Sequence, residues 1–378
     1  MSVNADNHAG YVLACSVIEN LHQKLGVNLL PIFMSYSLTD KEKRKKAAAL
    51  LIDGIFSKAA ERNESWFIED ESEFDLDSDI EIEPNISISE ADALTISNYK
   101  GQDVYEYTYT LVKRFENLAV AETPEQLAFS MVKNAILSVG VPLAKAVGVE
   151  LFKRVGLKKA IEVGIEHLGP KTAYAAVAVV LVALINFFFS LNPKKILGLV
   201  VNNTDSILEV KGFKTSTGDL HMRHGSMVSF MEDYADGLTS PKIQIGKREF
   251  ISKGNENNMV QVGIYAADKN WGLRGAEGIM MFSPKETVPL TMFNFAHMFA
   301  VPYKHNNRTN IVRLNSRSKP KSLDVLFQEL YNADKERVDF EEGTYRFTST
   351  VNDKRGGVVA CIASVHAVEK RLDTPPSA

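Results

Sequence analysis

The chain has 378 residues, a formal net charge of −4 and a hydrophobic content of 45%. This length is enough for two or three domains with full cores, and so mild a charge does not favour nucleic-acid binding. The two cysteines, Cys15 and Cys361, lie far apart and have no metal-type partner nearby, which argues against a disulfide framework or a zinc site. The first twenty residues lack the basic region of a signal peptide, so we expect a soluble chain made in a cytoplasm.

Residues 1–125 predict a helical N-terminal region. Apolar residues recur at helical spacing over 11–34 and again over 40–62, where Thr39 or Asp40 is a suitable N-cap. The stretch 99–118 fits either a strand or a helix, because its tyrosines alternate at period two before a helical spacing begins.

An acidic segment, residues 64–92, interrupts this region with twelve acidic residues and no basic one. We expect a solvated loop or an edge strand with one charged face. The spacing of its aspartates suggests a calcium loop, but Ile80 and Ile86 stand where the loop requires glycine and glutamate.

The stretch Thr172–Leu191 is uncharged over twenty residues and is bounded by Gly169-Pro170 and Asn192-Pro193. As a helix it would be about 30 Å long, the thickness of a bilayer's hydrocarbon core. It is either a membrane-spanning helix or a central helix wrapped by others in a soluble domain, and a helix stored in one state and inserted in another satisfies both interpretations. The predicted insertion residues are Thr172, Val177, Val180, Leu181, Leu184, Phe187, Phe188 and Leu191.

The preceding residues 129–168 mix lysines and arginines with apolar residues, and Val-Gly pairs recur every eight residues from Val139. This composition is typical of a basic amphipathic segment at a membrane surface, or of ordinary packed helices. Residues 126–193 therefore form a second predicted unit of membrane-active helices.

After Pro193, short β-type runs alternate with Gly, Asn, Asp and Pro, which predicts an all-β sandwich over 194–371 followed by a tail, 372–378. One helix interrupts the strands, with Ser322 as its N-cap and LDVLFQELYNADK as its body. The whole chain is predicted to be an α+β multidomain protein.

Several pieces of this half, in order, resemble the actinoporins, a family of α-helical pore-forming cytolysins. The pieces are KKILGLVVNNTD, GAEGIMMFSP, MFAVPY, NIVRL, LFQELY, and GTYRFTS through ACIASVHAVEK. The resemblance covers about residues 194–370 and implies a β-sandwich, with one or two short helices, that docks on lipid headgroups while the helix before it enters the bilayer.

The family holds a choline group in a cage of tyrosines, and this sequence departs from that pattern. Pro302 and Tyr331 match by position, Tyr303 belongs to the matching Val-Pro-Tyr run, Phe327 replaces one tyrosine and Arg308 another. These changes argue against sphingomyelin recognition and suit a phosphate, an anionic lipid or a glycan. The predicted headgroup-binding residues are Lys214, Pro302, Tyr303, Arg308, Phe327 and Tyr331.

No nucleotide, metalloprotease or hydrolase motif occurs, and His221-x-x-His224 has no third ligand. We therefore expect no enzyme, no catalytic residue, no metal and no cofactor. The expected function is that of a pore-forming toxin, lytic to cells, that binds a lipid or glycan receptor of a target membrane and assembles there as a homo-oligomer after non-classical release. The alternative is a lectin-like glycan-binding protein on the same sandwich, without lysis.

Overall fold

The structure is a computed structural model. It describes residues 5–62, 86–134, 136–137, 157–168, 170–210, 220–224, 226–229, 243–250, 258–269, 275–285, 293–314 and 322–368. The predicted acidic loop 64–92, apart from its last residues, and most of the Val-Gly repeat lie outside these ranges.

All but one of the described helices lie before residue 190 of the chain. They are α1 (Ala5–Leu25), α2 (Leu30–Met34), α3 (Asp40–Glu61), α4 (Glu90–Ser97), α5 (Gln102–Ala119), α6 (Pro124–Lys133), α8 (Leu157–Leu168), α9 (Pro170–Phe189) and α10 (Leu323–Asn332).

The described strands form two sheets, which we name sheet 1 and sheet 2. The strands are β1 (Ile86–Ser89), β2 (Ile136–Leu137), β3 (Lys195–Asn203), β4 (Leu208–Val210), β5 (Leu220–His224), β6 (Ser226–Ser229), β7 (Ile243–Ile245), β8 (Glu249–Phe250), β9 (Asn258–Asp268), β10 (Ala276–Pro284), β11 (Asn294–Val301), β12 (Arg308–Leu314), β13 (Arg337–Glu342), β14 (Tyr345–Val351) and β15 (Val358–Ala367). Sheet 1 has the order β13-β14-β15-β3-β9-β1-β2, with β6 and β8 also paired to β9. Sheet 2 has the order β12-β11-β10-β4-β7, with β5 paired to β10. Sheet 1 is mixed because β15 and β3 run parallel.

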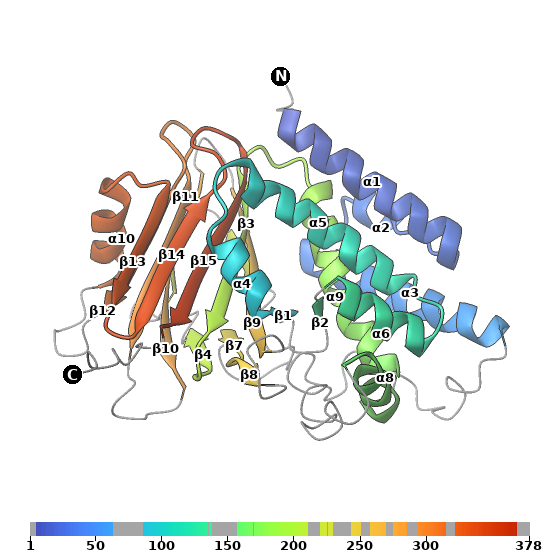
Figure 1. Ribbon diagram of the computed structural model, residues 1–378. Coiled ribbons are helices and arrows are strands. Elements are labelled where there is room, and N and C mark those ends of the chain that lie inside the picture. Colours follow the sequence, from blue (N-terminus) through green and yellow to red (C-terminus); the bar gives the residue numbers. More distant parts are fainter. Residues whose placement is uncertain are drawn as a thin grey trace, which may run out of the picture.

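The molecule is layered, with helices on one side, the two sheets in the middle and α10 on the far side (Figure 1). Side chains of β3 alternate between two cores, as the period of two in a strand requires. Leu197 and Leu199 join the core shared with the helices, whereas Ile196 and Val200 join the core between the sheets. A third, smaller core lies between sheet 2 and α10. Sheet 1 is thus buried on both faces, which explains why β3 is apolar almost throughout.

The α9 helix is the centre of the helical layer and packs against α1, α3, α5 and α8. Thr172–Phe189 is long and apolar enough to cross a membrane, and among the described helices it alone meets that criterion. Most of this stretch is buried inside the protein, and a core helix of a soluble protein meets the same criterion. A helix that is hydrophobic all round is stable in water only when other elements cover every side of it.

Local sequence signals placed several elements correctly. Thr39 forms a capping box with Glu42 at the start of α3, and Ser322 caps α10 through the backbone N–H of Val325. The ambiguous stretch 99–118 is a helix, α5. It packs against both α9 and β15, and its buried residues form one broad face with Tyr105 and Tyr107 at opposite edges of that face.

Two short strands of sheet 1 were not predicted. Ile136–Leu137, where helices were expected, form β2, which pairs with β1. Residues 86–89, at the end of the predicted acidic loop, form β1, which pairs antiparallel with β9 and whose Ile86 and Ile88 are buried. The N-terminal region is therefore part of the sandwich sheet, and α4 follows β1 directly with Ser89 as its N-cap.

Candidate functional site

The Arg308 side chain is the centre of a polar cluster between sheet 2 and α10. Its guanidinium carbon lies 4.0 Å from the centroid of the Tyr331 ring. It donates to the carbonyl oxygens of Asn306 at 3.1 Å and Tyr331 at 2.7 Å, and it forms an ion pair with Asp334 at 3.3 Å. The buried guanidinium is therefore held in a fixed orientation by partners on three segments.

Arg223, on β5, brings a second guanidinium to the same place. It is exposed, and its guanidinium carbon lies 5.4 Å from the ring centroid of Phe327 and 5.6 Å from that of Tyr331. The two rings stack with their centroids 5.4 Å apart. No carboxylate among the described residues forms an ion pair with Arg223, so its charge is available to a ligand.

A buried carboxylate, Glu277, lies on the same face. Pairing across four strands aligns His224, Glu277, Ala300 and Arg308, and residues aligned in this way point to the same side of a sheet. Burial and, second, the Glu277 charge raise the pKa of Tyr331. Within the described part of the chain, no cation lies at ion-pair distance from Glu277, which leaves its oxygens able to accept hydrogen bonds from a ligand.

The loop from Pro302 to Asn307 borders this cluster. Pro302 is buried, whereas Tyr303, Lys304 and His305 are exposed. The loop starts where β10 approaches it closely: a Cβ on Gly275 would lie 2.6 Å from the Cα of Pro302, so only glycine fits there.

The structure brings together three of the six predicted headgroup-binding residues, Arg308, Phe327 and Tyr331, while Pro302 and Tyr303 lie in the loop that precedes Arg308. The sixth, Lys214, lies outside the described residues. Phe327 is fully buried beneath Arg223 and is the floor of the cluster rather than its surface. Sequence reasoning missed Arg223, because β5 reads as a polar strand and only its pairing with β10 shows which face it covers.

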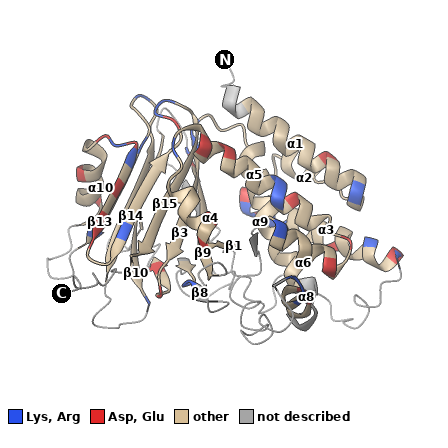
Figure 2. Cartoon of the chain, in the orientation of Figure 1, with Lys and Arg blue, Asp and Glu red and all other residues tan. Residues whose placement is uncertain are grey.

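Figure 2 shows acidic residues on α10 and charged residues of both signs over the neighbouring strands β13 and β14. Asp339 on β13 is held by Arg337 and Arg346, each with a nitrogen 2.8 Å from it, and these contacts lower its pKa, with the Arg346 hydrogen bonds the main cause. These charges neutralise one another. The Arg223–Arg308 cluster differs because one of its cations has no such partner among the described residues.

The predicted insertion residues all lie on α9 or directly after it. Those from Val177 to Phe188 are buried, and Thr172 is half-buried, while Leu191, after the end of the helix, is 65% exposed. The packing is close: a Cβ on Gly10 of α1 would lie 2.8 Å from the Phe188 ring. In this state the residues form the core of the helical layer.

A buried lysine closes the C-terminal end of α9. The Lys195 ammonium donates to the carbonyl oxygens of Phe187 at 2.6 Å and Ser190 at 2.5 Å, and it lies 4.8 Å from the Phe187 ring centroid. Burial lowers the pKa of Lys195 to about 7, against the opposing charge of Asp268. A cation at a helix C-terminus stabilises the helix dipole, so this residue fixes the junction between α9 and β3.

A Ser-His-Asn arrangement joins α4 to the sandwich. Ser97 Oγ lies 2.7 Å from His366 Nε2, and His366 Nδ1 lies 3.1 Å from Asn203 Nδ2, which also donates to Glu90 at 3.0 Å. The carboxylate of Glu90 can only accept, so the amide nitrogen of Asn203 faces it, and His366 Nδ1 must accept from that nitrogen too. The proton is then on Nε2, which donates to Ser97 while Ser97 donates to the Ala93 carbonyl.

This imidazole cannot take the serine proton, so the arrangement is not a nucleophile with its base. Burial lowers the pKa of His366 to about 4, with the charge of Arg346 acting in the same direction. Its role is to satisfy buried polar groups between α4 and sheet 1.

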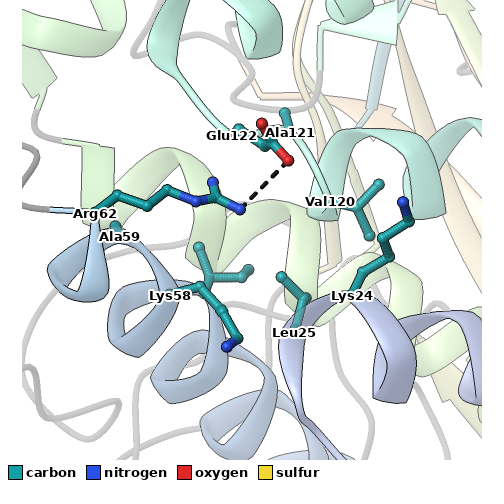
Figure 3. Close-up of a pocket in the computed structure, with 9 residues that line it drawn as sticks. Lys24, Leu25, Lys58, Ala59, Arg62, Val120, Ala121 and Glu122 are labelled. Atoms are coloured by element: carbon teal, nitrogen blue, oxygen red, sulfur yellow. Dashed lines mark hydrogen bonds and ion pairs between the residues drawn. The ribbon is translucent and has the colours of Figure 1, made fainter.

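A small pocket lies where α1, α3 and α5 end (Figure 3). It is lined by Lys24, Lys58 and Arg62, and Arg62 forms an ion pair with Glu122 at 3.3 Å. Helix C-termini carry partial negative charge that nearby cations stabilise. The pocket volume of about 20 Å³ holds about one water molecule. These cations are therefore explained by helix capping.

No group of three or more metal-type ligands occurs among the described residues. His221 instead lies 3.4 Å from Asp324 on α10. Both cysteines are free, with Cys361 buried in the sandwich core.

No family model and no curated protein matches the chain. Among solved structures, the chain is similar to the lipid-binding protein Nakanori, with 12% identity over 46% of this chain and 71% of that one, at a TM-score of 0.32. It is also similar to the lectin XCL of Xerocomus chrysenteron, with 7% identity over 46% of this chain and 98% of that one, at a TM-score of 0.22. Both likenesses are weak and leave the resemblance to actinoporins unconfirmed. The chain is an α+β protein whose N-terminal helices are followed by a C-terminal half of mixed and antiparallel sheets.

Proposed function

We propose that this protein binds an anionic lipid headgroup with the α10 side of its sandwich and then forms a pore by inserting α9. The observation that carries the proposal is the gathering of two guanidinium groups, of Arg223 and Arg308, on the ring of Tyr331. A guanidinium matches the geometry of phosphate oxygens and donates to two of them at once. The exposed Tyr303 ring, in the loop before Arg308, suits the membrane–water interface.

The second step rests on α9. Its apolar side chains are hidden by α1, α3 and α5, so the chain stays soluble until these helices separate. One apolar helix cannot enclose water, so a pore requires several copies and a polar lining. The amphipathic α8 supplies such a lining, since Ala160 and Ile161 are buried and Lys158 and Lys159 are not.

Flotation with liposomes tests the first step. One set of vesicles contains phosphatidylcholine alone, and the other contains about 30% phosphatidylserine, which gives the surface a negative potential. We expect binding to the anionic vesicles only. Arg223→Gln should weaken it by about three- to tenfold, because one charge-assisted contact is worth about 1 kcal/mol. Lys100→Gln removes an equal charge from an exposed site between α4 and α5 and should change binding less. Equal losses in both variants would contradict a specific site.

Release of a trapped dye from the same vesicles tests the second step. Binding without release under neutral, acidic and proteolytic conditions would leave the protein a lipid-binding protein and remove the pore from the proposal.

A glycan-binding lectin is the competing function, and Glu277 is the observation that favours it. A buried carboxylate without a cationic partner among the described residues can accept hydrogen bonds from sugar hydroxyls. A glycan array decides between the two: binding to a defined glycan that is abolished by Glu277→Gln, with no binding to any vesicle, establishes the lectin.

A further inference from the structure

A group of exposed apolar side chains lies on α2 and the turn after it. Leu30 and Met34 are four residues apart on one face of α2 and are 41% and 49% exposed. Tyr36, two residues further, is 99% exposed. Phe33, between them in sequence, is buried and anchors α2 to the helical layer. We name Leu30, Met34 and Tyr36 the α2 tip.

The α2 tip lies at the C-terminal end of α9. The Phe33 ring is 5.6 Å from the ring of Phe189, the last residue of α9, and Tyr11 of α1 packs on the same ring at 5.0 Å. Two residues beyond, Leu191 is 65% exposed. The first turns of α3 also reach this end, since Asp40 and Arg44 line a cavity with Ser190 and Lys195.

Positive charge accompanies these apolar residues. The segment 40–46, DKEKRKK, which opens α3 four residues after Tyr36, contains five basic and two acidic residues. Lys41 and Lys46 are exposed. Exposed aromatic and aliphatic side chains beside lysines are complementary to the interface of an anionic bilayer, where rings enter the headgroup level and lysines meet phosphate.

We infer that the α2 tip is a second membrane-contact surface, which takes the headgroup and upper acyl region of an anionic bilayer and places the C-terminal end of α9 against it. This inference rests on the proposed membrane function and adds the point of first contact for α9. It assigns to the N-terminal helices a binding role separate from the cluster on α10.

A fluorescent probe at position 36 tests the inference. In a Cys15→Ser background, in which Cys361 is buried, Tyr36→Cys is labelled with an environment-sensitive dye. The matched control is Leu94→Cys on α4, an exposed apolar position on an element that packs against sheet 1. Anionic vesicles of the composition used for flotation should shift the emission at position 36 to the blue and leave the emission at position 94 unchanged.

Two unlabelled variants complete the experiment. Tyr36→Glu should weaken vesicle binding by about tenfold, since it removes an exposed ring that the bilayer would bury and adds a charge of the wrong sign. Leu94→Glu adds the same charge elsewhere and should weaken binding by less than about twofold. Both positions are exposed, so neither change disturbs a core.

The outcomes separate the two proposals. Vesicle binding that depends on Arg223, with no shift at position 36, overturns the α2 tip and leaves the headgroup site standing. A shift at position 36 with no effect of Arg223→Gln overturns the headgroup site and leaves the α2 tip standing. A shift of the emission when the protein concentration is raised without vesicles would show that a second copy of the chain covers the α2 tip, and this would overturn the inference. The absence of binding to any vesicle would overturn it too.

Discussion

Two buried histidines make the fold sensitive to acid at the residue level. His366 lies between α4 and sheet 1, and His297 lies between the sheets with its Nε2 2.8 Å from the Tyr265 hydroxyl. Burial lowers the pKa of each imidazole to about 4. Between pH 6.5 and pH 4 the unfolded chain binds protons that the native chain does not, so stability falls as the pH falls through this window.

We predict that the free energy of unfolding decreases by about 2 kcal/mol per histidine between pH 7 and pH 5. His366→Asn removes one titrating group and should reduce the decrease by about half, whatever its effect at pH 7. Urea denaturation at the two pH values measures this. The control His305→Asn, at an exposed position, should keep the full decrease. If the free energy of unfolding of His366→Asn fell as much as that of the unmodified chain, protonation of groups other than His366 would account for the acid sensitivity.

At the element level, the state of α9 depends on the helices around it. Leu181 and Leu184 are fully buried, so an aspartate at either position would place a charge in the core and unfold the protein before any membrane is met. A substitution on α9 therefore cannot separate insertion from stability. A covalent constraint on the helices that cover α9 can separate the two.

A reversible disulfide supplies that constraint. A Cβ on Gly54 of α3 would lie 3.5 Å from the Cβ of Val27, just after α1, within the range for a disulfide. We predict that the pair Val27→Cys and Gly54→Cys, with Cys15→Ser, blocks dye release when oxidised, because α1 and α3 then cannot move apart from each other to uncover α9. Reduction of the same sample should restore release. Equal release in both states would mean that α9 stays in place or leaves by another route.

For the molecule as a whole, the helical layer is a structural part of the sandwich. Leu197 and Leu199 of β3 and Ile362 of β15 pack against the helices, and β1 from the N-terminal region extends sheet 1. Separating the helices from sheet 1 exposes a continuous apolar face, and such a face is stable only against another apolar surface. Release of α9 therefore requires a membrane or a second copy of the chain to cover sheet 1.

We predict that residues 194–378 alone aggregate when produced without the helices, because one face of sheet 1 loses its cover. Size-exclusion chromatography and binding of a hydrophobic dye measure this, with the full chain as the control. A soluble monomer that binds no hydrophobic dye would show that the sandwich is independent of the helical layer.

The sequence by itself determined the features that depend on neighbouring residues. The uncharged stretch and its flanking prolines marked α9 closely, the capping residues Thr39 and Ser322 marked α3 and α10, and the alternation of short apolar runs marked the strands of the sandwich. Each of these signals is local, because helix caps, prolines and periodicity act over one or two turns.

Only the tertiary structure decided whether α9 is covered, whether the stretch 99–118 is a strand or a helix, and which strands β1 and β5 join. Burial of α9 needs the apolar faces of three helices that lie between fifty and almost two hundred residues away in sequence. Arg223 and Arg308 meet at Tyr331 because β5, β10, β11 and β12 are adjacent in one sheet. Such contacts depend on long-range pairing, whose register is set by the whole core and not by any one segment.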